Sequence, residues 1–250
     1  MIDYRDELIA RRLREVGYTL LVGGGKGGVG KSLVAAVTSL LLARSGHVVG
    51  LLDLDLHGPS SPTILGVSDK PAETSEGIVP PEVEGVRVMS IDLLAAGRPL
   101  PLHGAAKDEI VKELLALTSF GRLDYLVVDL PPGTGDELLS AARYLRGRRG
   151  GLVVTTSSPL SLSASRRALM IMSSLGLEIL GVIENMASGE GPAEGLAVGM
   201  GVRFLGRIPY DGGLAGVVGK TSAGRLLGTS FAESLRLALV RAGLLVKETR

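Results

Sequence analysis

The segment LVGGGKGGVGKSLVAAV, residues 21–37, runs from an apolar stretch through a glycine-rich turn into a second apolar stretch. Residues 25–32 within it read GKGGVGKS and satisfy the pattern G-x-x-x-x-G-K-[ST]. In that pattern, backbone N–H groups and the N-terminus of a helix surround phosphate groups, and glycines permit the tight turn because they lack a Cβ. The segment therefore predicts a buried strand, a phosphate-binding loop and a helix, in that order.

Strand and helix patterns alternate along the rest of the chain. Apolar runs predict strands at 18–24, 47–55, 86–92, 123–130, 150–158, 177–186 and 202–209. Helical spacing predicts helices at 3–16, 31–44, 107–120, 136–145, 160–174 and 231–246. Residues 57–84 predict irregular structure with one helical turn at 63–65, and residues 187–201 a glycine-rich loop that can hold a short helix. This alternation is typical of a three-layer α/β fold, in which a mostly parallel central sheet has helices on both faces.

Length, composition and charge bound the class of protein. A chain of 250 residues with 45% hydrophobic content can bury a large core, so we predict a single domain over 1–250 with an N-terminal helical extension at 1–17. The formal net charge of +1 gives no general electrostatic reason to bind nucleic acid or an acidic membrane. Because the N-terminus is charged and no window approaches ~18 consecutive apolar residues, we expect a cytoplasmic protein.

Cysteine and histidine usage excludes several kinds of site. The chain has no cysteine, which rules out disulfides, thiolate metal ligands and cysteine nucleophiles within it. Its three histidines show no metal-ligand spacing. We therefore do not expect a zinc or iron centre held by this chain alone.

The glycine-rich loop supplies the first candidate site residues. Lys31 would neutralise the β- and γ-phosphates of a nucleotide, and the Ser32 hydroxyl would bind Mg²⁺. Lys26 is a second lysine in the same turn, and a solvated surface charge is the default interpretation for it. The full set of expected nucleotide contacts in the loop is Gly25, Lys26, Gly27, Gly28, Val29, Gly30, Lys31, Ser32 and Leu33.

An acidic residue ends a second apolar strand in DYLVVDLPPGTGD. Asp129 is placed to hold the hydration shell of the magnesium ion, and the alternative is that it caps the following helix. The Pro-Pro-Gly that follows stiffens the backbone and frees the Gly133 N–H to approach a γ-phosphate. This segment therefore resembles a switch that senses the terminal phosphate.

Two further carboxylates end the strand in LLDLDLHGPSSP. Asp53 and Asp55 are two residues apart, so in extended geometry both side chains point the same way and need a shared cation or water. We assign Asp55 to orient the attacking water and Asp53 to support the metal end of the site. The alternative is that these carboxylates cap a loop.

Five segments in order resemble one family. They are GGKGGVGKS, LLDLDLHGPSSP, DYLVVDLPPGTGD, GVIENM and LGRIPYD, and they span residues 22–211. Together they look like the Mrp-type branch of the MinD and ParA superfamily of P-loop ATPases with a deviant Walker A motif. The resemblance implies the P-loop NTPase fold, ATP binding, slow magnesium-dependent hydrolysis and a homodimer that encloses two nucleotides.

The resemblance also implies roles that residue chemistry alone does not supply. Lys26 would cross the dimer interface to the nucleotide of the other subunit, so each loop lysine would serve a different nucleotide. Asn185 of ENM would hydrogen-bond the adenine, and the turn from Pro209 to Asp211 would line the base pocket.

One departure from the family pattern concerns iron and sulfur. Mrp-type proteins that carry iron–sulfur clusters have a C-x-x-C pair shortly after ENM, whereas this chain reads ENMASGEGPAEG there. Without cysteine the chain cannot supply thiolates to a bridging cluster, so we expect ATP and Mg²⁺ as cofactors and no iron–sulfur cluster.

Three functional hypotheses follow. The first is an ATPase switch acting as a homodimer on a client protein of unknown identity. The second is a MinD- or ParA-type positioning ATPase on membrane or DNA, and the third a nucleotide-binding regulator that hardly hydrolyses ATP. The C-terminal apolar stripe suits packing against the sheet better than a membrane, and the basic cluster at 143–150 suits a solvated helix end better than nucleic acid, so neither membrane nor nucleic acid is expected as a partner. The stripe consists of Phe231, Leu235, Leu239, Ala242 and Val246.

Overall fold

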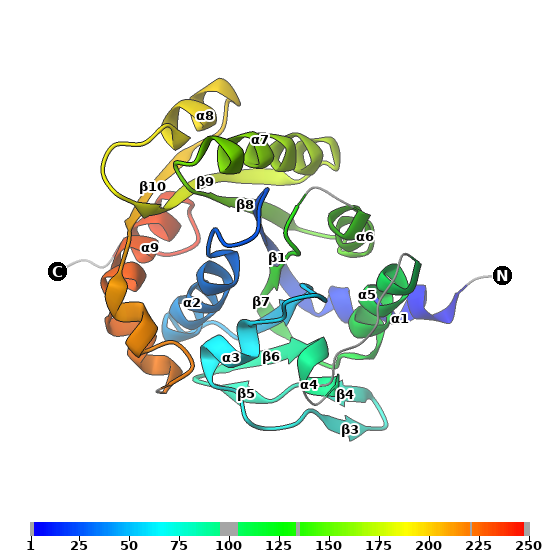
Figure 1. The fold of residues 1–250 in the computed structure, drawn as a ribbon. Helices are drawn as coiled ribbons and strands as arrows, with labels where there is room; N and C mark the ends of the chain where they lie inside the picture. The colour runs from blue at the N-terminus through cyan, green and yellow to red at the C-terminus, as the bar shows by residue number, and fades with distance from the viewer. Residues whose placement is uncertain (1–2, 96–104, 134–135, 221, 248–250) are drawn as a thin grey trace.

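A single eight-stranded sheet organises the protein (Figure 1). The computed structural model describes residues 3–95, 105–133, 136–220 and 222–247. The strand order is β10-β9-β8-β1-β7-β2-β6-β5, and all neighbouring pairs are parallel except β5 with β6. The strands are β1 (Val16–Gly23), β2 (Val49–Asp53), β5 (Glu82–Val83), β6 (Val86–Ser90), β7 (Leu123–Asp129), β8 (Arg149–Thr155), β9 (Glu178–Ala187) and β10 (Phe204–Pro209).

Helices cover both faces of this sheet, which confirms the predicted three-layer α/β class. One face packs against α2 (Lys31–Arg44), α3 (Ser61–Leu65), η2 (Ala223–Gly228) and α9 (Ser230–Arg241). The other face packs against α1 (Tyr4–Arg14), α5 (Ala105–Leu117), α6 (Asp136–Tyr144), α7 (Pro159–Ser174) and α8 (Ala193–Gly199). The short α4 (Ile91–Ala95) follows β6, and η1 (Gly212–Gly216) follows β10.

The core lies in two layers, one on each face of the sheet, because side chains alternate between the faces along each strand. In β1, Leu20 and Val22 are fully buried on the face of α2, whereas Leu21 is fully buried on the opposite face. Successive side chains of a strand point to opposite faces, so a strand covered on both sides is apolar throughout. The continuous apolar runs of the sequence are explained by this burial.

The structure differs most from the sequence-based expectations in two segments. Smaller differences lie at Val16, which begins β1 although it was expected in the first helix, and at residues 91–92, which were expected in a strand but belong to α4. Residues 57–84, expected to be irregular around one helical turn, hold α3 and a small antiparallel hairpin of β3 (Ala72–Thr74) and β4 (Gly77–Val79), as well as β5. The closing helix, expected to reach residue 246, ends at Arg241 because Gly243 adopts a φ of 77° and Leu244 N donates to the Leu239 carbonyl. The first four residues of the predicted stripe are buried as expected, but Val246 is 88% exposed.

The topology gathers the sequence motifs at one edge of the sheet. The carboxyl ends of β1, β7 and β2 are neighbours, and ligands of open α/β sheets bind outside the carboxyl ends of the strands. Within the described ranges, no helix is both long and apolar enough to cross a membrane.

Candidate functional site

The glycine-rich loop connects β1 to the N-terminus of α2. Gly28 and Gly30 adopt φ values of 78° and 87°, a region that disfavours residues with a Cβ. Gly30 is the N-cap of α2, and no side chain caps this helix. Since the first N–H groups of a helix lack intrahelical partners, those of α2 are available to an anionic ligand.

The loop packs so closely on its surroundings that side chains are excluded. An ideal Cβ on Gly25 would lie 1.9 Å from the carbonyl carbon of Ala164 in α7. An ideal Cβ on Gly24 would lie 2.6 Å from the carbonyl oxygen of Val154 in β8. Both neighbours are backbone atoms and cannot rotate away, so the glycines fix the position of the loop against β8 and α7.

The two lysines of the loop have different environments. Lys31 is 5% exposed, and its Cγ and Cδ atoms lie next to Gly24, so its aliphatic stem runs along the start of the loop. Lys26 is exposed and forms no hydrogen bond or ion pair with the described part of the chain. The structure therefore places Lys31 inside the site and leaves Lys26 at its surface.

Asp129 is a buried carboxylate that has no hydrogen-bond partner for either oxygen among the described residues. It lies in register with Val22 of β1 and with Asp53 of β2, directly under the loop. Burial, followed by the nearby Asp53 carboxylate, raises the pKa of Asp129 to about 8, while Ser32 and Lys31 act to lower it. A buried acid without a partner is costly, so this position fits a cation or its hydration shell.

Asp53, in contrast, is fully engaged by the backbone. Its Oδ1 accepts from the Asp55 N–H at 3.0 Å, and its Oδ2 accepts from the Ser60 and Ser61 N–H groups at 2.9 Å each. Burial raises the pKa of Asp53 above its usual value, and these hydrogen bonds offset only part of that rise. Asp53 therefore fixes the loop between β2 and α3, and its support of a metal ion stays a prediction.

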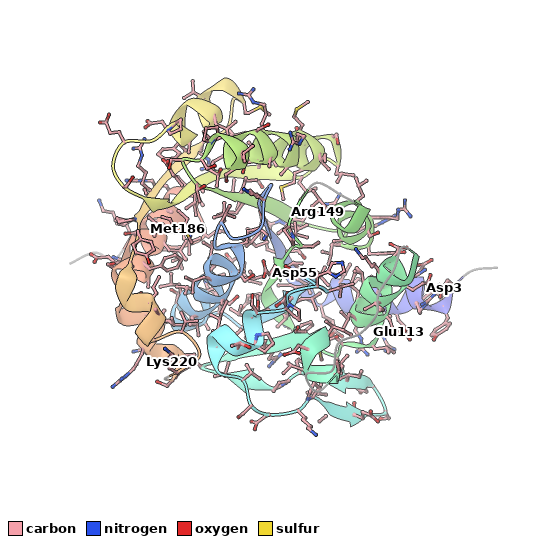
Figure 2. The ribbon with its side chains drawn as sticks, in the orientation of Figure 1. Asp3, Asp55, Glu113, Arg149, Met186 and Lys220 are labelled. Atoms are coloured by element: carbon pink, nitrogen blue, oxygen red, sulfur yellow. The ribbon has the colours of Figure 1, made fainter. Side chains whose placement is uncertain are left out.

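Asp55 accepts hydrogen bonds from the next residues of its own loop. Its Oδ1 binds the His57 N–H at 3.2 Å and the Gly58 N–H at 3.0 Å, which is the geometry of a loop cap. Figure 2 shows the side chain near the middle of the molecule, far from Asp3 and Lys220 at its sides. The water-orienting role of Asp55 stays a prediction beside this structural one.

The Pro-Pro-Gly segment after β7 lies beside the loop. An ideal Cβ on Gly27 would lie 3.9 Å from Cβ of Pro132, so the two segments touch. Gly133 has a φ of 103° and open space around its Cα. The segment is thus positioned next to the expected phosphates, and sensing of a γ-phosphate stays a prediction.

Asn185, expected to contact an adenine, makes a contact that sequence analysis did not find. Its Nδ2 donates to the Val29 carbonyl at 2.9 Å, and the side chain is almost completely buried. An ideal Cβ on Gly30 would lie 2.3 Å from this Nδ2. Asn185 therefore holds the glycine-rich loop in place through the Val29 carbonyl. The two residues are far apart in the sequence, so no local sequence pattern could have predicted this contact.

The other residues expected to line the base pocket, Pro209 and Asp211, lie at the end of β10 and just after it. Pro209 ends the strand and is exposed. Asp211 accepts from the Gly213 N–H at 2.9 Å and the Ser230 hydroxyl at 2.8 Å, which ties η1 to the start of α9. The neighbouring Met186 has a φ of 55°, a strained value of the kind that clusters at functional sites. Contacts of Pro209 and Asp211 with a base stay predictions.

A buried ion pair holds the segment that stands where cluster carriers have cysteines. Arg207 Nε donates to the fully buried Glu184 at 3.1 Å, and its Nη2 donates to Glu194 at 3.0 Å and to the Gly191 carbonyl at 3.2 Å. These contacts anchor residues 191–194 to β9 and β10. Sequence analysis missed them because the partners come from three separate elements.

Comparison with protein-family models identifies the family of this chain. The model described as ParA, NUBPL iron-transfer P-loop NTPase, matches residues 15–223. The chain belongs to this family. Family members are P-loop NTPases, and this chain is a nucleotide-binding P-loop protein of the Mrp and NUBP type without the cysteine pair.

Individual relatives agree with the family assignment. The chain is 36% identical over 227 residues to an iron-sulfur cluster carrier protein of Saccharolobus solfataricus, covering 84% of this chain and 77% of the relative. It is 37% identical over 230 residues to cytosolic Fe-S cluster assembly factor NUBP2 of Gallus gallus, covering 82% and 84%. A nucleotide-binding protein of Archaeoglobus fulgidus, solved with ADP and Co, superimposes with a TM-score of 0.73 at 34% identity, covering 85% of this chain and 89% of that one.

Proposed function

We propose that this protein is a magnesium-dependent ATP-binding protein and slow ATPase that works as a nucleotide-switched homodimer. The observation that carries the proposal is the Asp129 carboxylate, buried without a partner beneath a glycine loop that opens onto an uncapped helix N-terminus. The loop suits a polyphosphate and the carboxylate suits its cation. The A. fulgidus relative was solved in complex with ADP, which supports nucleotide binding by this chain.

The residues divide the work of binding and hydrolysis. The α2 N-terminus and Lys31 bind the phosphates, and Ser32 together with Asp129 would hold Mg²⁺ and its waters. When bound, Mg²⁺ neutralises charge that develops on the phosphate oxygens. Asp55 orients the attacking water, and Gly133 donates its N–H to the terminal phosphate. Asn185, Pro209 and Asp211 surround the base.

In the proposed homodimer, the exposed Lys26 has a role in binding the nucleotide of the other subunit. Because Lys26 has no partner among the described residues, its ammonium is free to reach a phosphate bound by a second copy. We assign the chain to one ATPase domain. The helical extension expected over 1–17 is shorter in the structure, where α1 covers Tyr4–Arg14 and β1 already begins at Val16. The cytosolic naming of the NUBP2 relative supports the cytoplasm as its location.

The relatives named as iron–sulfur cluster carriers support a role in cluster assembly, with one restriction. A chain without cysteine contributes no thiolate to a cluster, so any cluster ligands would come from a client protein. The proposed function is therefore to drive a client with the ATP cycle rather than to hold the cluster. A membrane-positioning function is less well supported because Phe231, Leu235 and Leu239 of α9 are buried against the sheet.

Phosphate release by purified variants tests the enzyme assignment. We expect Lys31→Ala and Asp55→Ala to lower the steady-state rate by roughly 100-fold. Lys70→Ala, at an exposed residue outside the site, is the matched control and should retain the rate of the unmodified protein. Equal rates in all variants would refute the ATPase, and calorimetry with ATP and Mg²⁺ would then show whether a non-hydrolysing binding protein remains.

Sedimentation velocity tests the dimer. With Mg²⁺ and a non-hydrolysable ATP analogue, the unmodified protein and Lys70→Ala should sediment as dimers. Lys26→Ala should bind the analogue but remain monomeric or dimerise more weakly. Dimerisation of Lys26→Ala at the same protein concentration as the control would contradict the role assigned to Lys26.

A further inference from the structure

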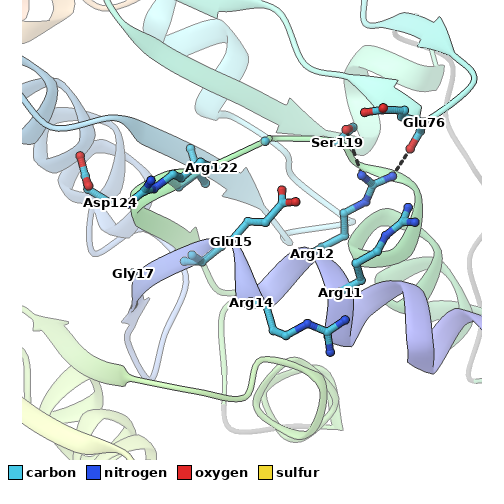
Figure 3. Close-up of a pocket in the computed structure, with 12 residues that line it drawn as sticks. Arg11, Arg12, Arg14, Glu15, Gly17, Glu76, Ser119, Arg122 and Asp124 are labelled. Atoms are coloured by element: carbon cyan, nitrogen blue, oxygen red, sulfur yellow. Dashed lines mark hydrogen bonds between the residues drawn. The ribbon is translucent and has the colours of Figure 1, made fainter.

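A groove crosses the edge of the sheet opposite the candidate nucleotide site. Two hollows of about 800 and 850 Å³ adjoin at the start of β1, where both are lined by Arg14, Val16 and Gly17. Because β1 runs from this edge to the glycine loop, its eight residues separate the groove from the loop by about 25 Å. We call the two hollows together the basic groove, and Figure 3 shows the first of them.

The second hollow concentrates unpaired positive charge. Its rim carries Arg14 from α1, Arg143 from α6, and Arg146 and Arg148 from the turn before β8. Asp6 and Lys112 also line the hollow, and they pair with each other at 2.7 Å. None of these arginines forms an ion pair with a carboxylate in the described residues. In a chain with a net charge of +1, four unneutralised arginines at one hollow form a local surface of positive potential that attracts an anionic partner.

The floor of the same hollow is apolar. Leu13 of α1 and Val16 of β1 line it and are half-buried, and Ile9 beneath them is 4% exposed and belongs to the core. Apolar side chains below a charged rim are typical of protein interfaces, where a buried apolar contact has a polar surround. A partner that fits both features carries negative charge and at least one apolar group.

The first hollow has mixed charge and is partly held in place. Arg12 donates to the Ser119 hydroxyl at 3.0 Å and to the Glu76 carbonyl, so it connects α1 to the segments after α5 and between β3 and β4. Figure 3 shows Arg14 pointing away from Arg12. Glu15 and Asp124 also line this hollow and would repel a uniform polyanion.

The aromatic residue of the groove is already occupied, which argues against single-stranded nucleic acid. The Tyr144 hydroxyl donates to Asp108 at 3.1 Å, and the Lys112 ammonium lies 5.5 Å from the ring centroid. Binding of single strands generally relies on aromatic faces on which bases stack. This ring is engaged from within the protein, so the groove offers charge and apolar surface without a stacking platform.

We propose that the basic groove docks an extended acidic segment of a partner protein, with an apolar side chain of that segment seated on Leu13 and Val16. Carboxylates of the segment would pair with Arg14, Arg143 and Arg148. The docking surface lies on α1, α6, the start of β1 and the turn before β8, and it includes no residue assigned to the nucleotide site. Its existence therefore does not depend on ATP binding.

Fluorescence anisotropy with a synthetic peptide tests this proposal without nucleotide. The probe is a labelled acidic peptide of about eight residues, which spans about 26 Å when extended, with a Leu-Phe pair at its centre. The triple variant Arg14→Gln, Arg143→Gln and Arg148→Gln should weaken its binding about tenfold or more. The matched control Arg44→Gln, Arg167→Gln and Arg225→Gln makes the same change in net charge at exposed positions elsewhere and should stay within about twofold of the unmodified protein.

Further measurements test whether the groove prefers an acidic peptide with an apolar centre over other anionic ligands. Replacing the Leu-Phe pair by serines should weaken binding, and an oligothymidylate of similar charge should bind less tightly than the peptide. If the triple variant does not fold, Arg148→Gln alone, in a turn outside any helix, should still weaken binding measurably. The proposal is overturned by absence of peptide binding at low salt, by equal loss in the control triple, by indifference to the apolar pair, or by tighter binding of the oligothymidylate. Calorimetry with ATP on the same proteins distinguishes this failure from failure of the nucleotide site.

Discussion

Replacing Gly25 by alanine should displace the glycine-rich loop. The new Cβ would lie 1.9 Å from the Ala164 carbonyl carbon, 2.2 Å from its oxygen and 2.3 Å from the Ser165 nitrogen. Carbon atoms in contact are normally about 3.5 Å apart, so the loop and α7 must separate by about 1.5 Å. Overpacking against backbone costs about 3 kcal/mol at the upper end of the usual range. For a chain of this size, that loss lowers the Tm by about 6–12 °C.

The same displacement should impair ATP binding, because a shift of about 1 Å in a positioning group can cost about 100-fold. Thermal and urea unfolding measure the stability, and calorimetry with ATP and Mg²⁺ measures the affinity. Gly195→Ala is the matched control, since an ideal Cβ at this position in α8 meets no atom within 4 Å. It should stabilise the protein by about 0.5–1 kcal/mol. If Gly25→Ala keeps both the Tm and the ATP affinity of the unmodified protein, the close packing of the loop on α7 is refuted.

Three further expectations concern other parts of the protein. Arg207→Met leaves the buried Glu184 without its cation and should lower the free energy of unfolding by about 3 kcal/mol in urea titrations, with partial recovery when Glu184→Gln is added. Asn185→Ala removes the hydrogen bond to the Val29 carbonyl and should cost about 1–2 kcal/mol; an unchanged preference for ATP over GTP in this variant would contradict the adenine contact. Hydrogen bonds from Arg5 and then Lys112 hold the pKa of Asp3 well below its usual value, so its contribution to stability is present above the unfolded pKa near 3.8 and is lost as the pH falls through the lower folded pKa. Asp3→Asn should flatten the acid side of the stability profile, and a profile identical to that of the unmodified protein would show that this contact contributes nothing.

Two kinds of element can be predicted from the sequence: strands that are buried on both faces of the sheet, and helices or strands that begin or end at recognisable turn residues. The strand ending at Asp129 and the helix beginning at Lys31 appear where their apolar patterns and flanking residues place them. The β3–β4 hairpin escaped prediction because all residues of Ala72–Thr74 are exposed, so no apolar alternation marks the strand. Gly243 was an available stop signal for α9, and the apolar stripe beyond it misled the assignment of the helix end.

The candidate site shows the same division between local and distant information. The glycines and Lys31 form one continuous motif, and the strand-end acids are expected to converge because parallel strands share their carboxyl edge. The backbone contacts of Asp53 with Ser60 and Ser61, and the Asn185–Val29 contact, depend on how loops from separate strands meet. Such contacts between distant loops cannot be predicted from the periodicity or the motif spacing of the sequence.

Helix α6 covers about half of the distance between the two edges of the sheet. It begins three residues after Gly133, extends for about 13 Å, and ends at Tyr144 on the wall of the basic groove. Ser140 and Tyr144 tie it to Asp108 of α5, so it is held along its length as a stiff rod. If a terminal phosphate displaces the Pro-Pro-Gly segment and α6 moves with it, the affinity of the basic groove for its ligand would change, and thermodynamic reciprocity would then require that ligand to change the affinity for nucleotide by the same factor.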